Sequence, residues 1–295
     1  MVTFQMTRKV GAMPGRPEWG AAFAAASTEA MSFYDEIMVP RLFAPWSELL
    51  LDELKPQRGQ AVLDVACGPG TVARQAALRV GPSGRVTGCD FSPAMLELAR
   101  SKTPLDDSAP TDYLECPADS LEVPDDDFDM VTCQQGVQFF PDRRAALVEM
   151  RRVLRPTGQL GIAVWCELDT CPPFAALGRA LGQVLGTETA DAYAAGPWGF
   201  GDSNTLVDLV LESGFVNVQV RRCELPVSFE GGPDQLMLSL RAASVSTVLA
   251  QLSEDRLSAL AAAVEEATRP IAFDGIIRSH ATSNIVTATV GDEKI

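Results

Sequence analysis

The sequence is poor in the residue types that bind metals or nucleic acids. It contains one histidine, His280, among 295 residues, and its seven cysteines include no C-x-x-C pair. Zinc sites and disulfide frameworks need such clusters, so we predict neither, and no metal site. Basic residues are also outnumbered, with 24 Lys and Arg against 39 Asp and Glu and a net charge of −15. Because phosphate binding relies on clustered Lys and Arg, a nucleic-acid partner is not expected.

Long apolar runs are absent as well. No uninterrupted apolar segment reaches the roughly 18 residues that a membrane span requires, so no membrane partner is expected. Residues 11–16 are rich in Gly and Pro where a signal peptide would need an apolar stretch. Together with scattered cysteines that suit free buried thiols, this pattern predicts a soluble protein in a reducing cytoplasm.

A glycine turn directly after an apolar run is the most informative feature that is present. Residues 61–65 read as a buried strand, and Gly68 and Gly70 follow it. These glycines place no side chain between the backbone and a ligand, and a helix opening near Thr71 directs free N–H groups toward the same place. Asp90 ends the next predicted strand, where a carboxylate can accept hydrogen bonds from both hydroxyls of a ribose. These features predict one site for an adenosine-containing ligand.

Two classes of protein have a glycine turn of this kind. The run from Gly68 to Ala73 satisfies the G-x-G-x-x-A pattern of dinucleotide-binding proteins, which would make the chain a nicotinamide-dependent dehydrogenase. In such proteins the first glycine usually comes straight after the strand, whereas here the residues from Asp64 to Cys67 precede it. The resulting D-x-x-C-G-x-G-T run resembles the first motif of class I S-adenosylmethionine-dependent methyltransferases. The resemblance implies that the loop wraps the methionine end of the cofactor and that Asp64 helps to fix its amino group.

Later segments extend the resemblance over about residues 60–165. The run D-F-S-P-A-M-L at 90–96 is similar to the second motif of that family, which implies Asp90 on the ribose and apolar adenine walls from Phe91 and Met95. The resemblance also implies that Asp119 accepts a hydrogen bond from the adenine amino group. Gln134 and Gln135, at the end of the following strand, would contact the methionine part of the cofactor. Tyr34 lies in an N-terminal helical region where related enzymes place an aromatic residue against the cofactor; simple helix packing is its alternative. The expected cofactor site thus comprises Tyr34, Asp64, Ala66, Gly68, Gly70, Thr71, Asp90, Phe91, Met95, Ala118, Asp119, Ser120, Gln134 and Gln135.

The order of predicted elements indicates an α/β fold. Strand, helix and strand alternate from 61 to 165, which calls for a parallel sheet covered on both faces. The resemblance implies a Rossmann-like, seven-stranded, mostly parallel sheet with an antiparallel last strand. We expect a mobile arm at 1–20, a helical cap at 21–56 and a methyltransferase domain at 57–295 with helical lid insertions near 167–200 and 230–275. Within these, helices are expected at 29–37, 45–54, 173–185, 203–214, 232–241 and 254–268, with late strands at 216–220 and 285–290.

Candidate residues for the acceptor and for catalysis are fewer. Gln138 and Phe139 follow the fourth strand, and Trp198 and Phe200 form an aromatic pair in a Gly-rich loop; helix-entry and core-packing roles are their alternatives. His280 has the pKa range of a general base, although a single histidine is more often structural. The function that these features favour is methyl transfer from S-adenosylmethionine to a small or medium-sized, apolar acceptor. A non-methylating cyclisation or rearrangement in the same pocket, and a dehydrogenase, are the alternatives. The acceptor, the methylated atom and the oligomeric state, a homodimer included, stay open.

Overall fold

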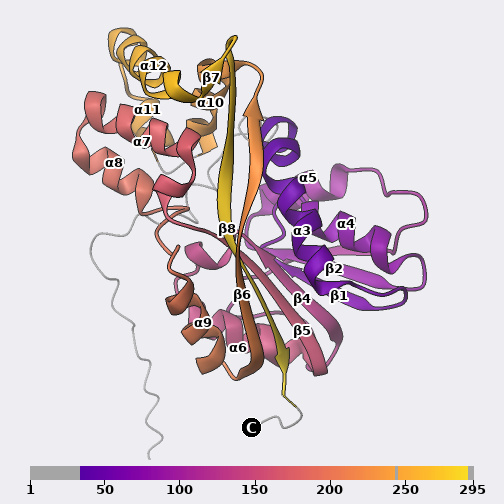
Figure 1. Cartoon of the computed structure of the whole chain (residues 1–295). Coiled ribbons are helices and arrows are strands. Elements are labelled where there is room, and N and C mark those ends of the chain that lie inside the picture. The colour runs from indigo at the N-terminus through magenta and orange to yellow at the C-terminus, as the bar shows by residue number, and fades with distance from the viewer. Residues whose placement is uncertain (1–33, 243–244, 292–295) are drawn as a thin grey trace, which may run out of the picture.

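The computed structural model describes residues 34–242 and 245–291, and its central feature is one mixed sheet (Figure 1). The strand order is β3-β2-β1-β4-β5-β8-β6, with the short β7 paired to β8. The first five strands of this order run parallel, and β8 runs antiparallel to both β5 and β6. The expected Rossmann-like fold with an antiparallel last strand is confirmed. The strands are β1 (Ala61–Val65), β2 (Arg85–Asp90), β3 (Thr111–Glu115), β4 (Phe128–Gln134), β5 (Leu154–Trp165), β6 (Phe215–Phe229), β7 (Ala272–Phe273) and β8 (Ile276–Val290).

Helices cover both faces of this sheet. Side chains of α3 and α4 belong to the apolar core on one face, and side chains of α6 and α9 belong to the core on the other. No helix in the ranges that the structure describes is long and apolar enough to cross a membrane. The helices on or beside the sheet are η1 (Tyr34–Phe43), α3 (Ala44–Leu54), α4 (Thr71–Val80), α5 (Pro93–Ser101), α6 (Arg143–Val153) and α9 (Ser203–Glu212), with the single turn η2 (Val137–Phe139).

A second group of helices forms a lid beyond one end of the sheet (Figure 1). It consists of η3 (Leu168–Thr170), α7 (Pro172–Leu185), α8 (Thr187–Ala194), α10 (Gly232–Leu238), η4 (Ser239–Ala242), α11 (Ser246–Leu249), α12 (Glu254–Thr268) and η5 (Arg269–Ile271). These segments lie in or beside the two stretches in which lid insertions were expected. The division of the chain into arm, cap and domain stays a prediction, and the arm at 1–20 lies outside the described residues.

Local sequence explains where several helices begin. The Ser92 hydroxyl accepts a hydrogen bond from the Met95 N–H, and Pro93 occupies the first helical position of α5, as expected for a capped helix. Asp142 and Asp202 cap α6 and α9 in the same way through the N–H groups of Ala145 and Thr205. These caps set the points at which the chain turns back from the ends of the strands.

The last two long strands extend much further than expected. They were predicted at 216–220 and 285–290, but β6 and β8 each run for 15 residues and rise out of the sheet into the lid (Figure 1). The upper half of β6 alternates more buried with more exposed positions, the upper half of β8 carries Arg278, Ser279 and His280, and Val227, Phe229 and Ile277 pack in the same core as the lid helices. Polar residues on the opposite face hid this extension in the sequence. The predicted helix at 232–241 is α10 followed by η4, and the residues of the predicted 29–37 helix before Tyr34 lie outside the described chain.

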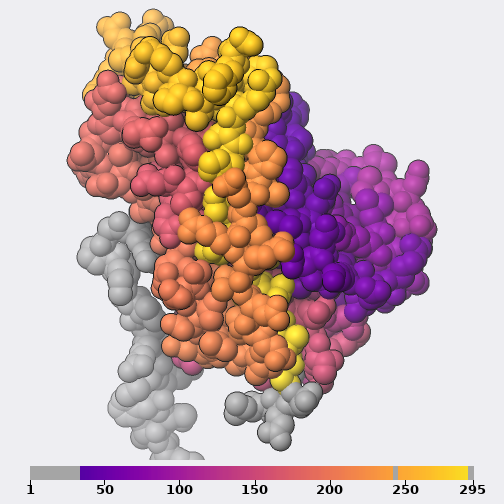
Figure 2. Space-filling view, in the orientation of Figure 1, coloured from indigo at the N-terminus to yellow at the C-terminus, as the bar shows by residue number. Residues whose placement is uncertain are grey.

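The N-terminal helices lie beside this long hairpin. Figure 2 shows the indigo N-terminal part of the described chain against the orange strand β6. Arg41 of η1 forms an ion pair with Glu230 at 3.0 Å, and Glu53 of α3 pairs with Arg221 of β6 at 2.5 Å. One pair lies near the lid and the other near the sheet, so the hairpin connects both parts to the N-terminal helices.

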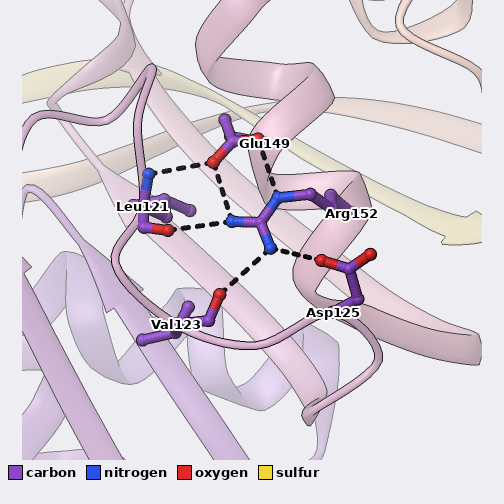
Figure 3. Close-up of polar contacts among 5 residues, drawn as sticks. All are labelled: Leu121, Val123, Asp125, Glu149 and Arg152. Carbon is purple, nitrogen blue, oxygen red and sulfur yellow. Dashed lines mark hydrogen bonds and ion pairs between the residues drawn. The ribbon is translucent and has the colours of Figure 1, made fainter.

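One arginine fixes the loop between β3 and β4, residues 116–127 (Figure 3). The Arg152 guanidinium donates to both carboxylate oxygens of Glu149 at 2.8 Å and to Asp125 at 2.5 Å. It also donates to the carbonyl oxygens of Leu121 at 2.8 Å and Val123 at 3.0 Å. Glu149 in turn accepts the Leu121 N–H at 2.9 Å, and its interaction with Arg152 lowers the pKa of Glu149. Side chains of α6 therefore hold the loop, together with backbone hydrogen bonds from Asp126 and Asp127 to the carbonyls of Arg152 and Val153.

Replacing this arginine should destabilise the fold. Arg152→Met keeps an apolar stem but leaves two carbonyl groups and the Glu149 carboxylate without their shared donor, at a cost of roughly 2 kcal/mol in the free energy of unfolding. Urea denaturation measures the loss. Arg144→Met, an exposed position on the same helix, is the matched control. Equal stability of the two variants would contradict the role assigned to Arg152.

Candidate cofactor and acceptor site

A cavity of about 430 Å³ lies between the sheet and the lid. Its floor comes from the residues that follow the carboxyl ends of β1, β2, β3 and β4, and Trp165 at the end of β5 also lines it. The strand order reverses between β1 and β4, which is where open α/β sheets place their ligands. The topology therefore puts the cavity at the position that the glycine turn predicted.

The loop after β1 forms one wall with bare backbone. Gly68 has φ +52°, and apart from the glycine and its two chain neighbours no heavy atom of the described residues lies within 4 Å of the point where a Cβ would stand. Ala66 lines the same wall with φ +56°, a left-handed conformation that costs a non-glycine residue energy and is common at ligand sites. The space beside Gly68 is a cradle that any side chain at this position would fill.

Asp90 at the end of β2 holds this loop in place. Its two carboxylate oxygens accept the N–H groups of Gly68 and Ser92, each at 2.9 Å. Burial raises the pKa of Asp90, and these hydrogen bonds act against the rise. The carboxylate lines the cavity, and its remaining acceptor capacity is available to a ligand donor.

Asp64 lies behind the loop and does not line the cavity. It is buried, its Oδ1 accepts the Thr132 hydroxyl at 2.8 Å, and its Oδ2 accepts the Ala73 N–H at 3.1 Å. Burial raises the pKa of Asp64 to about 7, with a smaller contribution from Asp90. Protein donors thus occupy the carboxylate that the family resemblance directs to the cofactor amino group, and that role stays a prediction.

The structure brings ten of the fourteen predicted cofactor residues to the cavity wall. Gly70 is turned toward Tyr113, whose hydroxyl lies 2.5 Å from the point where a Gly70 Cβ would stand. Thr71 begins α4, and Ser120 lies just beyond the lining part of the β3–β4 loop. The ten that line the cavity are Tyr34, Ala66, Gly68, Asp90, Phe91, Met95, Ala118, Asp119, Gln134 and Gln135.

Glutamines form the wall at the end of β4. Gln134 donates its amide to the Phe43 carbonyl at 3.0 Å, which leaves its Oε1 buried without a partner. Gln135 has φ +56° and donates to the Ser283 hydroxyl at 3.1 Å. Gln138 donates to Gln135 at 3.4 Å and also keeps an unpartnered Oε1, but it does not line the cavity.

Of the predicted acceptor residues, some line the cavity and others do not. Phe139 and Trp198 line the cavity, and the Trp198 ring packs between Phe174 at 5.4 Å and Tyr193 at 5.1 Å between ring centroids. The Phe200 ring does not line it and lies under the Arg143 guanidinium at 4.3 Å. The substrate roles of Gln138 and Phe200 have no cavity contact to support them.

His280 lies on β8 and is not among the residues that line the cavity. Its Nε2 is 3.6 Å from a carboxylate oxygen of Glu224 on the neighbouring strand. Both side chains are more than a third exposed. A catalytic role of His280 therefore stays a sequence prediction that no contact among the described residues supports.

Sequence reasoning missed most of the apolar wall opposite the strand ends. Aromatic residues from five segments line the cavity there, and Phe43 and Trp165 approach to 6.2 Å between ring centroids. An apolar residue on a helix reads the same in sequence whether it faces a core or a cavity, so only the periodicity of these helices was visible. The lining residues outside the prediction are Met38, Leu42, Phe43, Ser92, Cys116, Pro117, Gly136, Phe140, Pro141, Asp142, Ala146, Trp165, Cys171, Phe174, Tyr193, Pro197 and Ser239.

The charges of the wall suit a cationic ligand. Asp90, Asp119 and Asp142 line the cavity, whereas none of its described lining residues is Lys or Arg. No group of three or more His, Cys, Asp or Glu within the described ranges is placed to hold a metal ion. S-adenosylmethionine carries an adenosine, an ammonium and a sulfonium. It fits this site because the backbone at Gly68 is bare, the Asp90 carboxylate can accept hydrogen bonds from ribose hydroxyls, and the rim is acidic.

Comparisons with known proteins agree with this fit. The model of the ubiE/COQ5 methyltransferase family matches residues 28–225. The chain is 32% identical over 193 residues to a demethylmenaquinone methyltransferase of Listeria welshimeri, covering 61% of this chain and 80% of that protein. It is 32% identical over 199 residues to the Staphylococcus aureus JH9 protein of the same name, covering 63% and 78%.

Solved structures show the same fold at lower sequence identity. Haemonchus contortus phosphoethanolamine N-methyltransferase 2, in complex with S-adenosyl-L-methionine, is 19% identical with a TM-score of 0.56, covering 90% of this chain and 57% of that one. The cyclase SpnF is 20% identical with a TM-score of 0.53, covering 85% and 82%. Methylating and cyclising proteins thus share this architecture, and the fold alone does not separate them.

The raised pKa of Asp64 should make stability depend on pH. The folded chain keeps the Asp64 proton up to about pH 7, whereas an unfolded Asp releases it near its ordinary pKa of 3.8. Within this window the folded state binds more protons, so stability falls as pH rises, by about 1.4 kcal/mol per pH unit from this group. Asp64→Asn should remove that slope, as measured by urea unfolding at several pH values in the window. The same slope in both proteins would mean that Asp64 is ionised in the fold.

Proposed function

The chain belongs to the ubiE/COQ5 methyltransferase family and methylates a small molecule with S-adenosylmethionine, and we propose that its acceptor is a planar aromatic ring carrying a hydroxyl group. Membership of this family decides between the two interpretations of the glycine turn, in favour of the methyltransferase over the dehydrogenase. The relatives named demethylmenaquinone methyltransferases point to quinone-type acceptors. The aromatic wall of this chain supports the same class independently.

The observation that carries the proposal is the pairing of flat apolar walls with two unpartnered polar atoms. Phe174, Tyr193, Trp198 and Trp165 line the cavity, and rings of this kind pack well against a planar ligand. The Trp198 Nε1 has no hydrogen-bond partner, with only the weakly accepting Cys171 thiol nearby. A buried polar atom left unpaired costs about 1–3 kcal/mol, so a ligand that pairs it gains that much.

The two atoms have opposite hydrogen-bonding character. Gln134 Oε1 comes from the end of β4 and accepts, whereas Trp198 Nε1 comes from the lid and donates. Both atoms are buried under the cavity wall, so each side chain turns toward the acceptor that binds: a hydroxyl on the acceptor then donates to Gln134 Oε1, and an oxygen on the acceptor accepts from Trp198 Nε1. A ring with both, such as a reduced quinone, matches the pair better than a fully oxidised quinone, which has no O–H to donate.

This chain's residues act on the reaction by binding and positioning. When bound, S-adenosylmethionine supplies an electrophilic methyl group on a sulfonium. Asp90 holds the ribose and Gly68 leaves room for the amino-acid end, and the aromatic wall and Gln134 orient the acceptor while they exclude water. Holding two reactants in attack geometry contributes up to about 7–11 kcal/mol to the rate of such a step. The acidic rim at Asp119 and Asp142 favours the cationic cofactor over its product, in which the sulfur is neutral.

The cofactor half of this proposal is tested at Asp90. Asp90→Ala removes the carboxylate that binds the Gly68 N–H and faces the cavity, so binding of S-adenosylmethionine should weaken by roughly 1–3 kcal/mol. Isothermal titration calorimetry measures the change. Asp112→Ala on the exposed surface of β3 is the control. Wild-type affinity in the Asp90 variant would contradict the assignment of Asp90 to the cofactor. Gly68→Val should bind S-adenosylmethionine still more weakly, because the valine side chain fills the cradle.

The acceptor half is tested with a panel of small molecules. The chain is incubated with S-adenosylmethionine and either a dihydroxynaphthalene, the corresponding naphthoquinone, an aliphatic alcohol or an alkylamine, and products are read by mass. We expect a methylated product from the dihydroxynaphthalene. A product of unchanged mass would favour a cyclisation or rearrangement, and methylation of the alkylamine alone would contradict the aromatic acceptor.

Trp198 provides a matched test within the same assay. Trp198→Phe keeps the ring but removes the N–H, so the KM for the hydroxylated acceptor should rise roughly tenfold while binding of S-adenosylmethionine is unchanged. Trp46→Phe makes the same replacement in the buried core beside Trp165. If both variants change KM alike, the indole N–H does not contact the acceptor.

A further inference from the structure

Lys102 joins three segments of chain that lie far apart in the sequence. It is the first residue after α5, and its ammonium donates to the Asp35 carboxylate at 2.6 Å and to the Pro69 carbonyl at 2.9 Å. Asp35 is the second residue of η1, and Pro69 stands between the two glycines of the loop after β1. The side chains of Lys102 and Asp35 are each only 20% exposed, so water screens their ion pair less than it screens a surface pair.

Each of these segments supplies part of the cavity wall. Tyr34, directly before Asp35, lines the cavity from η1, and Gly68, directly before Pro69, lines it from the loop. Met95 lines it from α5, the helix that Lys102 follows. One ammonium group thus connects three parts of the cofactor wall from the side away from the cavity.

The charges around Tyr34 make this connection necessary. Burial raises the pKa of Tyr34, and Asp90 and Asp35 raise it further, which places both carboxylates close to the same ring. No lysine or arginine among the described lining residues of the cavity lies beside these two carboxylates. The Lys102 ammonium is the cation that compensates Asp35 at this end of η1.

The opposite end of η1 is held in another way. Arg41, near the last turn, pairs with Glu230 after β6 and donates to the Ile37 carbonyl at 3.2 Å. Arg41 itself lies more than one turn away from Tyr34 along the helix. The position of Tyr34 relative to Gly68 therefore depends on the contact at Lys102 and on the packing of the Tyr34 ring against Phe43, at 5.0 Å between ring centroids.

We propose that Lys102 is a positioning residue that latches η1 onto the glycine loop and thereby sets the affinity for S-adenosylmethionine. The proposal rests on the proposed function only in taking this cavity as the cofactor site. Without the ammonium, Asp35 is left half-buried and unpaired near Asp90, and the first turn of η1 moves away from the loop. The wall at Tyr34 then opens, and the cofactor loses a contact surface without any change in the residues that touch it.

Binding of S-adenosylhomocysteine tests the latch without an acceptor. Lys102→Met keeps the apolar stem and removes the charge, so the Kd measured by calorimetry should rise about tenfold. Lys102→Arg keeps a cation in reach of both partners and should restore most of the affinity. Arg100→Met is the matched control, because Arg100 stands at the same end of α5 but donates to the Tyr113 carbonyl instead.

Hydrogen exchange distinguishes a latch from a general loss of stability. In Lys102→Met, backbone amides of residues 34–43 should exchange faster with S-adenosylhomocysteine bound, while those of β1 and β4 keep their wild-type protection. Unchanged Kd and unchanged exchange at 34–43 would overturn the proposal. Faster exchange throughout the chain would also overturn it, because the lysine would then support the fold as a whole.

A double variant tests whether Lys102 and Asp35 act as one pair. Asp35→Asn should weaken binding by itself, and Asp35→Asn combined with Lys102→Met should bind no more weakly than the worse single variant, because both remove the same pair. Additive losses would contradict the latch. If Lys102→Met does not fold, Asp35→Asn and Lys102→Arg carry the comparison. Failure of the wild-type chain to bind S-adenosylhomocysteine would refute the cofactor site itself, an outcome separate from these.

Discussion

The site depends on one carboxylate that ties two strand ends together. Asp90 is the last residue of β2, and it accepts a hydrogen bond from the N–H of Gly68 in the loop after β1. This hydrogen bond fixes the loop beside the space where the ligand is expected. The same carboxylate accepts the N–H of Ser92, which begins α5. A single buried acid therefore shapes the glycine loop, starts the next helix and presents its remaining lone pairs to the cavity. Its raised pKa reflects the cost of burying it there.

The lid is built on the hairpin of β6 and β8 instead of on loops. Both strands continue past Trp165, the last residue of β5, and carry the pairing from the sheet up beneath α7, α10 and α12. This rigid connection places aromatic residues of the lid opposite the strand ends. The proposed cofactor wall comes mostly from short contiguous motifs, whereas the proposed acceptor wall comes from segments distant in sequence.

That division also explains what the sequence could predict. The mostly parallel sheet with an antiparallel last strand follows from the family that runs such as 64–71 and 90–96 resemble, and neighbouring residues in these runs include several that line the cavity. Asp64 shows the limit of this reasoning, because its partners Thr132 and Ala73 come from elements that no local pattern connects to it. Tyr193 and Trp165 could not be assigned to the acceptor wall, since apolar spacing does not reveal which core a helix or strand end faces. The long upper half of β6 escaped for a related reason, since alternate positions there are exposed.

The most direct measurement is a crystal structure of the chain with S-adenosylhomocysteine. The predicted result is a nucleoside whose ribose hydroxyls lie within hydrogen-bond distance of the Asp90 carboxylate, with the amino-acid end filling the space beside Gly68. A structure in which the ligand is bound elsewhere, or in which Asp90 contacts only Gly68 and Ser92, would contradict the central claim that this carboxylate both shapes and reads the cofactor site.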